Sequence, residues 1–435
     1  MEEAATPRLV RVVGLAGLTA IALNGVVGSG IFVLPAVVFR LTGEASLAAY
    51  LVAAVLTALV VACFAEAGSL FEETGGPYLY ARAAFGSFAG FLVGWMFFLA
   101  RLAAGAAIAN AFAATLGYLA PGLGHGFGRA AVITIALFAL AALNVAGVRL
   151  GSLAVNVLTV GKLVPLAVFV VIGLFFVDHS RISFLALPET ASLRQAALLL
   201  VFAFGGFENA SVPTEEAREP RRHVPLSLLA TITATTLLYV LIQVVAQGTL
   251  PGLAGSATPL ASSARVFMGA GGAVFITVAA VLSTLGSTSA LALVGPRILY
   301  AFARHGQLPS ALAAVHPRHR TPHRAVVLYA LLTWAAALSG RFEQLAAVSA
   351  VARLLFSAST CLAVPVLRRV RPSSERGFTL PGGWLIPLLA AALSLWLLSG
   401  LTRGQALAGG VALASGIAVY AAVRLSGNPR PTRGV

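Results

Sequence analysis

The stretch Asn24–Gly30 (NGVVGSG) interrupts the first long hydrophobic segment of the chain with glycines at three of its seven positions. A second interruption, Phe204–Glu208 (FGGFE), lies in another hydrophobic segment about 180 residues further along. In a bilayer every backbone N–H and C=O group must be satisfied, so a break at membrane depth persists only where it lines a cavity or binds something. Matched breaks in two halves of a chain are typical of a binding site at the centre of a membrane protein.

The composition of the 435 residues indicates a protein embedded in a membrane. Hydrophobic residues make up 59% of the chain, charged residues only 10%, and the mean hydropathy is +0.93. Such values lie outside the range of soluble globular domains. Apolar stretches of about 18 or more residues, enough to cross roughly 30 Å of hydrocarbon, predict twelve transmembrane helices, at 12–40, 46–70, 88–119, 129–147, 152–177, 194–213, 224–247, 266–303, 323–339, 344–367, 384–400 and 405–424. The predicted fold class is an all-α polytopic membrane protein.

The net charge of +15 suggests nucleic-acid binding, but the distribution of the charges excludes it. The arginines are spread over short loops and form no basic domain or arm. Most of them fall on one side of the predicted spans, in both termini and in loops such as 213–225 and 303–323. The positive-inside rule then places both termini in the cytoplasm of a multi-pass protein of the plasma (inner) membrane, surrounded by membrane lipids. The first span is not a removable signal peptide, and the tail 425–435 is predicted to be disordered.

The two cysteines, Cys63 and Cys361, fall inside apolar spans, where a buried thiol is the ordinary interpretation and a disulfide has no support. The spans contain no cluster with metal-ligand spacing and no nucleophile paired with a base. We therefore expect no metal, no cofactor and no enzymatic activity. The oligomeric state is left open.

A single membrane domain over residues 1–435 is predicted to contain two structural repeats. A shift of about 180 residues superimposes the two broken spans, and it also places 46–70 on 224–247, 88–119 on 266–303 and 152–177 on 344–367. We expect the first repeat at 12–177, the second at 194–368, and two extra helices at 384–424. An odd number of spans per repeat inserts the second copy upside down, which is the design that supports alternating access.

The first break offers both donors and acceptors to a ligand. Its glycines, Gly25, Gly28 and Gly30, leave free N–H groups at the start of the half-helix that follows, where the helix dipole also favours a carboxylate. The Ser29 hydroxyl adds a donor, and the carbonyls of Val26 and Val27 suit an ammonium group. An α-amino acid carries both groups. The alternative is a small-residue face for helix packing.

The second break, FAFGGFENAS, repeats this pattern in the opposite orientation and exposes carbonyls from Phe202 to Gly205. Aromatic side chains beside it, above all Phe202, either cover the substrate as a gate or pack against other helices. Glu208 ends the break at a depth where an ionised carboxylate is costly and usually functional. It is either a protonatable switch or a structural cap on free N–H groups.

Lys162, the only lysine of the chain, lies about ten residues into the fifth predicted span. Arginine keeps its proton at any accessible pH, whereas a buried lysine can release it. We expect its amine near the Gly25 carbonyl and a hydroxyl of the eighth span, from Ser283, Thr284, Ser287 or Thr288, where it replaces a coupling sodium ion. The alternative is a lysine that extends to the membrane boundary.

Other arginines are predicted to lie within or beside the spans. Arg101 and Arg353 each need a partner or a wet cavity. Arg101 either lines the substrate cavity or pairs with Glu66, and we predict the pair. Arg297 is expected to be a cation at the membrane boundary.

Four motifs of the chain are similar to those of one family: GVVGSGIFVLPA, AEAGSLFEETGGPYLYARAAFG, FAFGGFENASVPTEEAREPRRHVP and GPRILYAFARHGQLP. Over nearly its whole length the chain resembles the amino acid-polyamine-organocation (APC) superfamily of permeases. It departs from the family pattern at Phe71-Glu72-Glu73, where a proline is common, and at His305, where an aspartate is frequent. The resemblance implies the LeuT-like fold of five plus five inverted spans with discontinuous helices 1 and 6.

The resemblance also implies roles for particular residues. Ser29 and Gly30 bind the substrate carboxylate, and the carbonyls of Val26, Phe202 and Gly205 bind its amino group. We expect Gly28 and Gly206 to bind the substrate as well. Lys162 matches a fifth-helix lysine that occupies the sodium position of proton-coupled relatives, with Ser287 as the nearest hydroxyl. Phe202 is the gate, and Glu208 matches a position implicated in the pH response of arginine/agmatine exchangers.

Two differences bear on the substrate. Those exchangers have a tryptophan in place of Phe202 and a polar residue near Gly105, so a guanidinium side chain is less well provided for here. Arg101 matches an arginine of L-type transporters and disfavours cationic substrates. We therefore expect a permease for neutral amino acids that moves its substrate together with a proton. The alternative is an exchanger of amino acids or polyamines with the same fold.

Overall fold

The computed structural model describes residues 9–183, 189–340, 342–372 and 377–425, and they are almost entirely helical. In chain order the α-helices are α1 (Leu15–Val26), α2 (Gly30–Thr42), α3 (Ser46–Gly68), α4 (Pro77–Phe85), α5 (Ser87–Leu119), α6 (Gly126–Ala146), α7 (Val148–Gly173), α8 (Thr190–Phe204), α9 (Pro220–Thr249), α10 (Pro259–Arg304), α11 (His323–Ser339), α12 (Phe342–Val370), α13 (Leu385–Leu398) and α14 (Arg403–Leu425). Short 3-10 helices join them, among them η5 (Phe207–Ser211) and η6 (Thr214–Glu216). The all-α prediction is confirmed.

Each of the twelve segments predicted to be transmembrane contains a helix or, at 12–40 and 194–213, two short helices separated by a break. Within the described ranges, eight helical stretches are long and apolar enough to cross a membrane, and four apolar helices are shorter. The polytopic character agrees with the prediction. The number of twelve crossings stays a prediction.

Helix α10 extends beyond the segment predicted for it. It begins at Pro259, whereas the predicted segment starts at residue 266, and Gly269 interrupts it with φ +69°. Such a positive φ suits glycine and ends regular helical geometry. The residues before Gly269 therefore form a separate short helix ahead of the long one.

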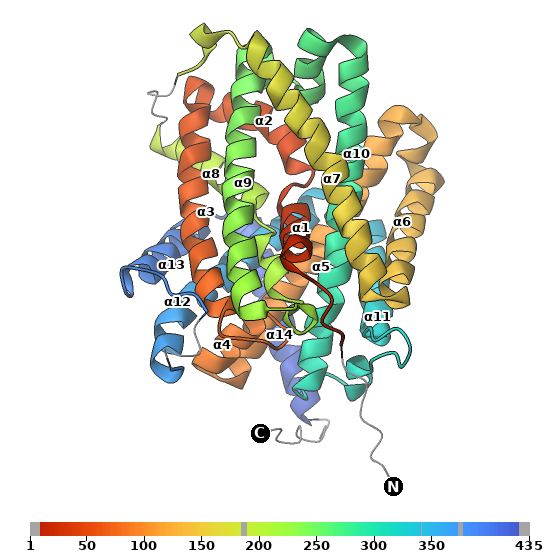
Figure 1. Ribbon diagram of the computed structural model, residues 1–435, viewed down its shortest axis with the longest axis vertical. Helices are drawn as coiled ribbons and strands as arrows, with labels where there is room; N and C mark the ends of the chain where they lie inside the picture. Colours follow the sequence, from red (N-terminus) through yellow and green to blue (C-terminus); the bar gives the residue numbers. More distant parts are fainter. Residues whose placement is uncertain (1–8, 184–188, 341, 373–376, 426–435) are drawn as a thin grey trace.

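Helix α1 lies in the middle of the bundle (Figure 1), where it packs against α7, α9 and α10. Helix α3 packs along α9, α10 packs along α5 and α7, and α12 packs along α5. Helices α13 and α14 add to one side, against α12, α3 and α5. The breaks themselves are buried, at Val26 and Val27 in the first and at Phe204 and Gly206 in the second, which is where irregular backbone is tolerated in a membrane protein.

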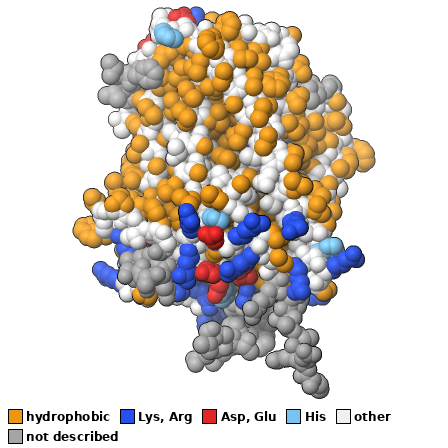
Figure 2. All heavy atoms as spheres, in the orientation of Figure 1, with side chains coloured by type: hydrophobic (Ala, Val, Ile, Leu, Met, Phe, Trp, Pro, Cys, Tyr) orange, Lys and Arg blue, Asp and Glu red, His pale blue; other side chains and the backbone are white. Residues whose placement is uncertain are grey.

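The outer surface of the bundle is apolar over most of its height. Figure 2 shows hydrophobic side chains over the upper and middle part of one face, while basic and acidic side chains gather at the lower end. Large apolar side chains such as Phe127, Phe175, Leu407 and Val411 are between 69% and 89% exposed. An apolar surface this extensive is unusual for a soluble protein and fits a lipid environment.

Ion pairs join several segments at the charged end. Arg11 and Arg221 both contact Glu72 at 2.9 and 3.0 Å, and Arg304 contacts Glu215 at 2.8 Å. His305 lies 3.4 Å from Glu73, its partner in the loop between α3 and α4. These pairs tie the start of the chain and the loop after the second break to α10 and to the α3–α4 loop.

The prediction that Arg297 is a cation at the membrane boundary is wrong. Its side chain is fully buried and donates two hydrogen bonds to Glu216, from Nη2 at 2.7 Å and from Nε at 3.2 Å. The reason is the loop after the second break, which folds beneath α10 and is held there because the N–H groups of Val12 and Val13 donate to the Glu216 carbonyl. Two opposite charges are thus buried together.

Candidate functional site

Both glycine clusters interrupt helices at the predicted places. Helix α1 ends at Val26, Val27 is non-helical with ψ 81°, and α2 begins at Gly30. Helix α8 ends at Phe204, and Gly206 has φ +122° before η5 begins. Only glycine adopts this last conformation without strain.

The two breaks touch each other through their backbones. A Cβ atom added to Gly25 would overlap the carbonyl of Gly206, and one added to Gly206 would overlap the carbonyl of Gly25. No side chain fits between them. Segments that are about 180 residues apart in the sequence therefore meet at van der Waals contact, and the two glycines are needed for that approach.

The carbonyls at the first break have polar partners from neighbouring helices. The Tyr239 hydroxyl of α9 lies 3.0 Å from the Val26 oxygen and 3.4 Å from the Ala203 oxygen, so it connects the ends of α1 and α8. The Ser283 hydroxyl donates to the Val27 oxygen at 2.9 Å. The Val26 oxygen also accepts the Gly28 N–H at 2.8 Å, so both of its lone pairs have a donor within the protein.

Lys162 is completely buried on α7 and points into the first break. Its Nζ donates to the Val27 oxygen at 2.6 Å and to the Ser283 oxygen at 3.2 Å, and it lies 3.4 Å from the Ser287 hydroxyl. The Ser287 hydroxyl donates in turn to the Asn24 carbonyl at 2.6 Å. Lys162 and Ser287 thus meet, but the amine contacts the Val27 carbonyl and not the expected carbonyl of Gly25.

A cavity of about 50 Å³ opens beside the breaks. It is lined by Gly25, Val26, Gly28, Ser29, Gly30, Arg101, Ala104, Ala107, Ile108, Ala203, Gly205, Asn209, Leu291 and Arg353. Helix α2 begins at this cavity without a side-chain cap, so its first N–H groups are available to a ligand. The predicted residues Val26, Gly28, Ser29, Gly30 and Gly205 all line the cavity.

Two other predicted residues have different positions. Gly206 lies against Gly25, behind the cavity wall. Phe202 belongs to α8, but its side chain lies outside the described part of the structure, so the gate stays a prediction.

A cluster of three buried charges borders the cavity. Glu208 lies 2.9 Å from Nη2 of Arg101 and 3.2 Å from Nη1 of Arg353. The other oxygen of Glu208 accepts the Gly206 N–H at 2.8 Å. Glu208 thus caps the second break and also holds arginines from α5 and α12. Its protonation during function stays a prediction.

The predicted pair between Arg101 and Glu66 is wrong. Arg101 pairs with Glu208, and it also donates from Nη1 to the Asn209 side chain at 2.8 Å. Glu66 instead accepts two hydrogen bonds of 2.6 Å from Arg368 of α12. Both oxygens of Glu66 accept from Arg368, and one also accepts the Leu380 N–H at 2.9 Å, so Glu66 is already engaged away from Arg101.

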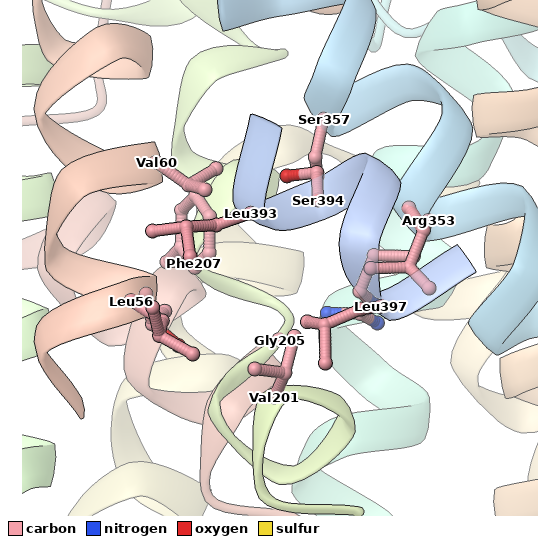
Figure 3. Close-up of a pocket in the computed structure, with 12 residues that line it drawn as sticks. Leu56, Val60, Val201, Gly205, Phe207, Arg353, Ser357, Leu393, Ser394 and Leu397 are labelled. Carbon is pink, nitrogen blue, oxygen red and sulfur yellow. The ribbon is translucent and has the colours of Figure 1, made fainter. Parts of the chain in front are cut away.

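A second cavity, of about 30 Å³, lies between α3, α8, α12 and α13. Gly205 and Arg353 line both cavities, so they form the partition between them. Figure 3 shows Leu56 and Val60 of α3 and Leu393 and Leu397 of α13 among the residues around this second space. It lacks the N–H groups at the start of α2, and the first cavity is therefore the candidate substrate site.

Sequence reasoning missed Asn209 and Tyr239 in this site. Asn209 directly follows Glu208 in η5, and its position in the second break was a usable signal. Tyr239 is a single hydroxyl within an apolar helix, and no pattern in the sequence distinguishes it from a packing residue.

Comparison with known proteins agrees with this geometry. Residues 13–413 match the model of the family described as "Amino acid permease". The chain is 29% identical to the serine/threonine exchanger SteT of Bacillus subtilis, over 90% of this chain and 91% of that protein. It is 28% identical to the mouse b(0,+)-type amino acid transporter 1, over 91% of this chain and 83% of that protein.

A third relative is the branched-chain amino acid permease BcaP of Bacillus subtilis, which is 26% identical over 90% of this chain and 88% of that protein. All three relatives are transporters. The resemblance to the APC superfamily inferred from the four motifs is confirmed. The chain belongs to the amino acid permease family of multi-pass membrane transporters.

Proposed function

We propose that this protein is a secondary active transporter that carries neutral amino acids across the cytoplasmic membrane together with a proton. The observation that carries this proposal is the meeting of two kinds of backbone group at one cavity. N–H groups at the start of α2 border it, and so does the carbonyl end of α1 at Val26. The first suit a carboxylate and the second suits an ammonium group.

Proton coupling is assigned to Lys162. Its amine holds the Val27 carbonyl, one residue beyond the end of α1, and it reaches α10 at Ser283 and Ser287. A charged amine strengthens these bonds, whereas a neutral amine in this buried place weakens them. Gain and loss of one proton therefore change how firmly the first break is held to α7 and α10.

The proposed arrangement in the membrane has twelve crossings in two inverted repeats. It is supported by the packing of α3 on α9 and of α5 on α10, because the proposed repeat equates the members of each pair. The charged end of the bundle, with its arginine pairs, faces the cytoplasm by the positive-inside rule. Both termini then lie on the cytoplasmic side, and Phe202 serves as the gate over the substrate.

A second candidate is an amino acid exchanger of the same fold. It is favoured by the similarity to SteT, whose name describes an exchanger. An exchanger requires substrate on the opposite side for each turnover, whereas a symporter requires a proton gradient.

Uptake into proteoliposomes separates these candidates. Purified protein is reconstituted, and the entry of labelled neutral amino acids is measured with and without an inward proton gradient, in liposomes with and without internal substrate. Stimulation by the gradient without internal substrate supports symport. Uptake that requires internal substrate and is independent of the proton gradient supports exchange. Absence of uptake for all twenty amino acids under every condition would refute the proposal.

A further inference from the structure

Two buried donors beside the substrate cavity have no acceptor within the described part of the chain. They are Nε of Arg101, on α5, and Nδ2 of Asn209, in η5. The side chain of Arg101 is 1% exposed, and Asn209 is fully buried. Both residues line the cavity.

The orientation of the Asn209 amide follows from its neighbour. Arg101 donates to it through Nη1 at 2.8 Å, and a guanidinium can only donate, so the oxygen of the amide must face Arg101. The amide nitrogen must then face the other way, where it lies against Gly25 at the first break. Arg101 therefore holds the amide nitrogen of Asn209 at the first break, in a residue that lines the cavity.

Buried donors of this kind are rare in proteins, because a donor removed from water without an acceptor is costly. The cavity lining includes the small or apolar side chains of Ala104, Ala107, Ile108 and Leu291, which offer no acceptor of their own. The start of α2 already provides donors for a substrate carboxylate. The pair on Arg101 and Asn209 thus serves a second acceptor on the ligand.

We infer that Arg101 and Asn209 form a specificity subsite for neutral amino acids whose short side chain carries an oxygen acceptor, a hydroxyl or an amide. This inference rests on the proposed function, since it requires that an amino acid occupies the cavity. Among substrates of equal size, the subsite is expected to bind those whose side chain accepts a hydrogen bond more tightly than those whose side chain does not. Cationic side chains, which only donate, are rejected.

The test compares ligand pairs of nearly equal shape on the full-length protein. Threonine and valine, and serine and alanine, are titrated as competitors of labelled substrate uptake into proteoliposomes. Each hydroxyl amino acid is expected to compete at concentrations about tenfold or more below its apolar partner, which is the effect of one hydrogen bond. Asparagine and aspartate distinguish a neutral acceptor from a carboxylate.

Asn209→Asp sharpens the test, because it keeps an oxygen towards Arg101 and replaces the donor at the cavity with an acceptor. The preference for threonine over valine is expected to fall about tenfold or more. Asn110→Asp is the matched control. Asn110 also accepts from an arginine, Arg129, but does not line the cavity, so the preference should be retained.

The outcomes separate the two proposals. If no amino acid competes or is transported, the proposed function fails. If amino acids are transported but threonine and valine compete equally in the unmodified protein, the subsite inference is overturned and the proposed function stands. This comparison needs no variant, so poor folding of Asn209→Asp does not affect it.

Discussion

Lys162 donates a hydrogen bond of 2.6 Å to the carbonyl oxygen of Val27, at the point where the first helix of the chain is interrupted. The same amine reaches the Ser283 carbonyl and the Ser287 hydroxyl of α10. One side chain thus links α7, the first break and α10. A change in the charge of this amine acts on all three at once.

Lys162→Met tests this relationship, because it keeps an apolar side chain of similar length and removes the amine. Stimulation of uptake by an inward proton gradient is expected to fall about tenfold or more, while amino acid binding, measured by thermal shift, changes less. Arg40→Met, which removes an exposed cation at the end of α2, is the control and should retain the stimulation. Full gradient-driven uptake by Lys162→Met would show that the lysine has only a structural role.

Gly25→Ala is expected to destabilise the protein by at least about 2 kcal/mol, because its Cβ overlaps the Gly206 carbonyl. The backbone there cannot yield without separating the two breaks. Gly410→Ala is the matched control, since Gly410 is exposed on α14 with open space around it and should leave stability unchanged or slightly raised. The measurement is the midpoint of thermal unfolding in detergent. Equal midpoints for the two variants would contradict the close contact.

Arg297→Met is expected to cost about 3–5 kcal/mol, because it leaves the Glu216 carboxylate buried without its partner. Arg297→Met combined with Glu216→Leu should recover most of this loss, since neither charge then remains. Denaturant titration of each variant measures the free energies of unfolding. If the double variant is as unstable as the single one, the loss does not come from the unpaired Glu216 carboxylate. The ion pair itself would then stabilise the protein.

The pair of Glu73 and His305, at the charged end of the bundle, predicts that the stability of the protein depends on pH. The hydrogen bond to His305 lowers the pKa of Glu73 below its ordinary value of 4.5. This bond therefore contributes stability above about pH 4.5, and the contribution is lost as the pH falls through the lowered pKa. The Glu73 side chain is 61% exposed, so screening by water limits the effect to well under about 1 kcal/mol.

Glu73→Gln and His305→Gln should each reduce the loss of stability between pH 6 and pH 4. The double variant should show no further reduction, because both single changes break the same bond. Thermal midpoints across this pH range provide the measurement. Additive effects of the two changes would indicate that the residues act on other partners.

The sequence allowed the helical breaks to be predicted because glycine weakens the interior of a helix, and a cluster of glycines in an apolar segment favours an interruption there. The meeting of Lys162 with the α10 hydroxyls also followed from the sequence, by way of a lone lysine and a family resemblance. The partner of Arg101 did not. Two buried carboxylates, Glu66 and Glu208, were available to it, and only the tertiary structure shows that Glu66 pairs with Arg368 and Glu208 with Arg101.

Other features depend equally on tertiary packing. Arg297 lies near the end of a helix, and only the fold of the loop carrying Glu216 determines that it is buried. Asn209 becomes a cavity donor because Arg101 fixes its amide. Tyr239 joins two carbonyls that are far apart in the sequence. In each case the relevant neighbour comes from a distant segment, which residue spacing does not show.

The backbone contact between Gly25 and Gly206 has a mechanical consequence. With no side chain between them, and with the Tyr239 hydroxyl joining the ends of α1 and α8, the two broken helices cannot slide past each other without losing this contact. We therefore expect them to move as one rigid body during transport. The boundary along which the protein opens is then expected to run around this pair of helices, through the contacts of Lys162 with Val27 and of Arg101 with Glu208, and not between the two breaks.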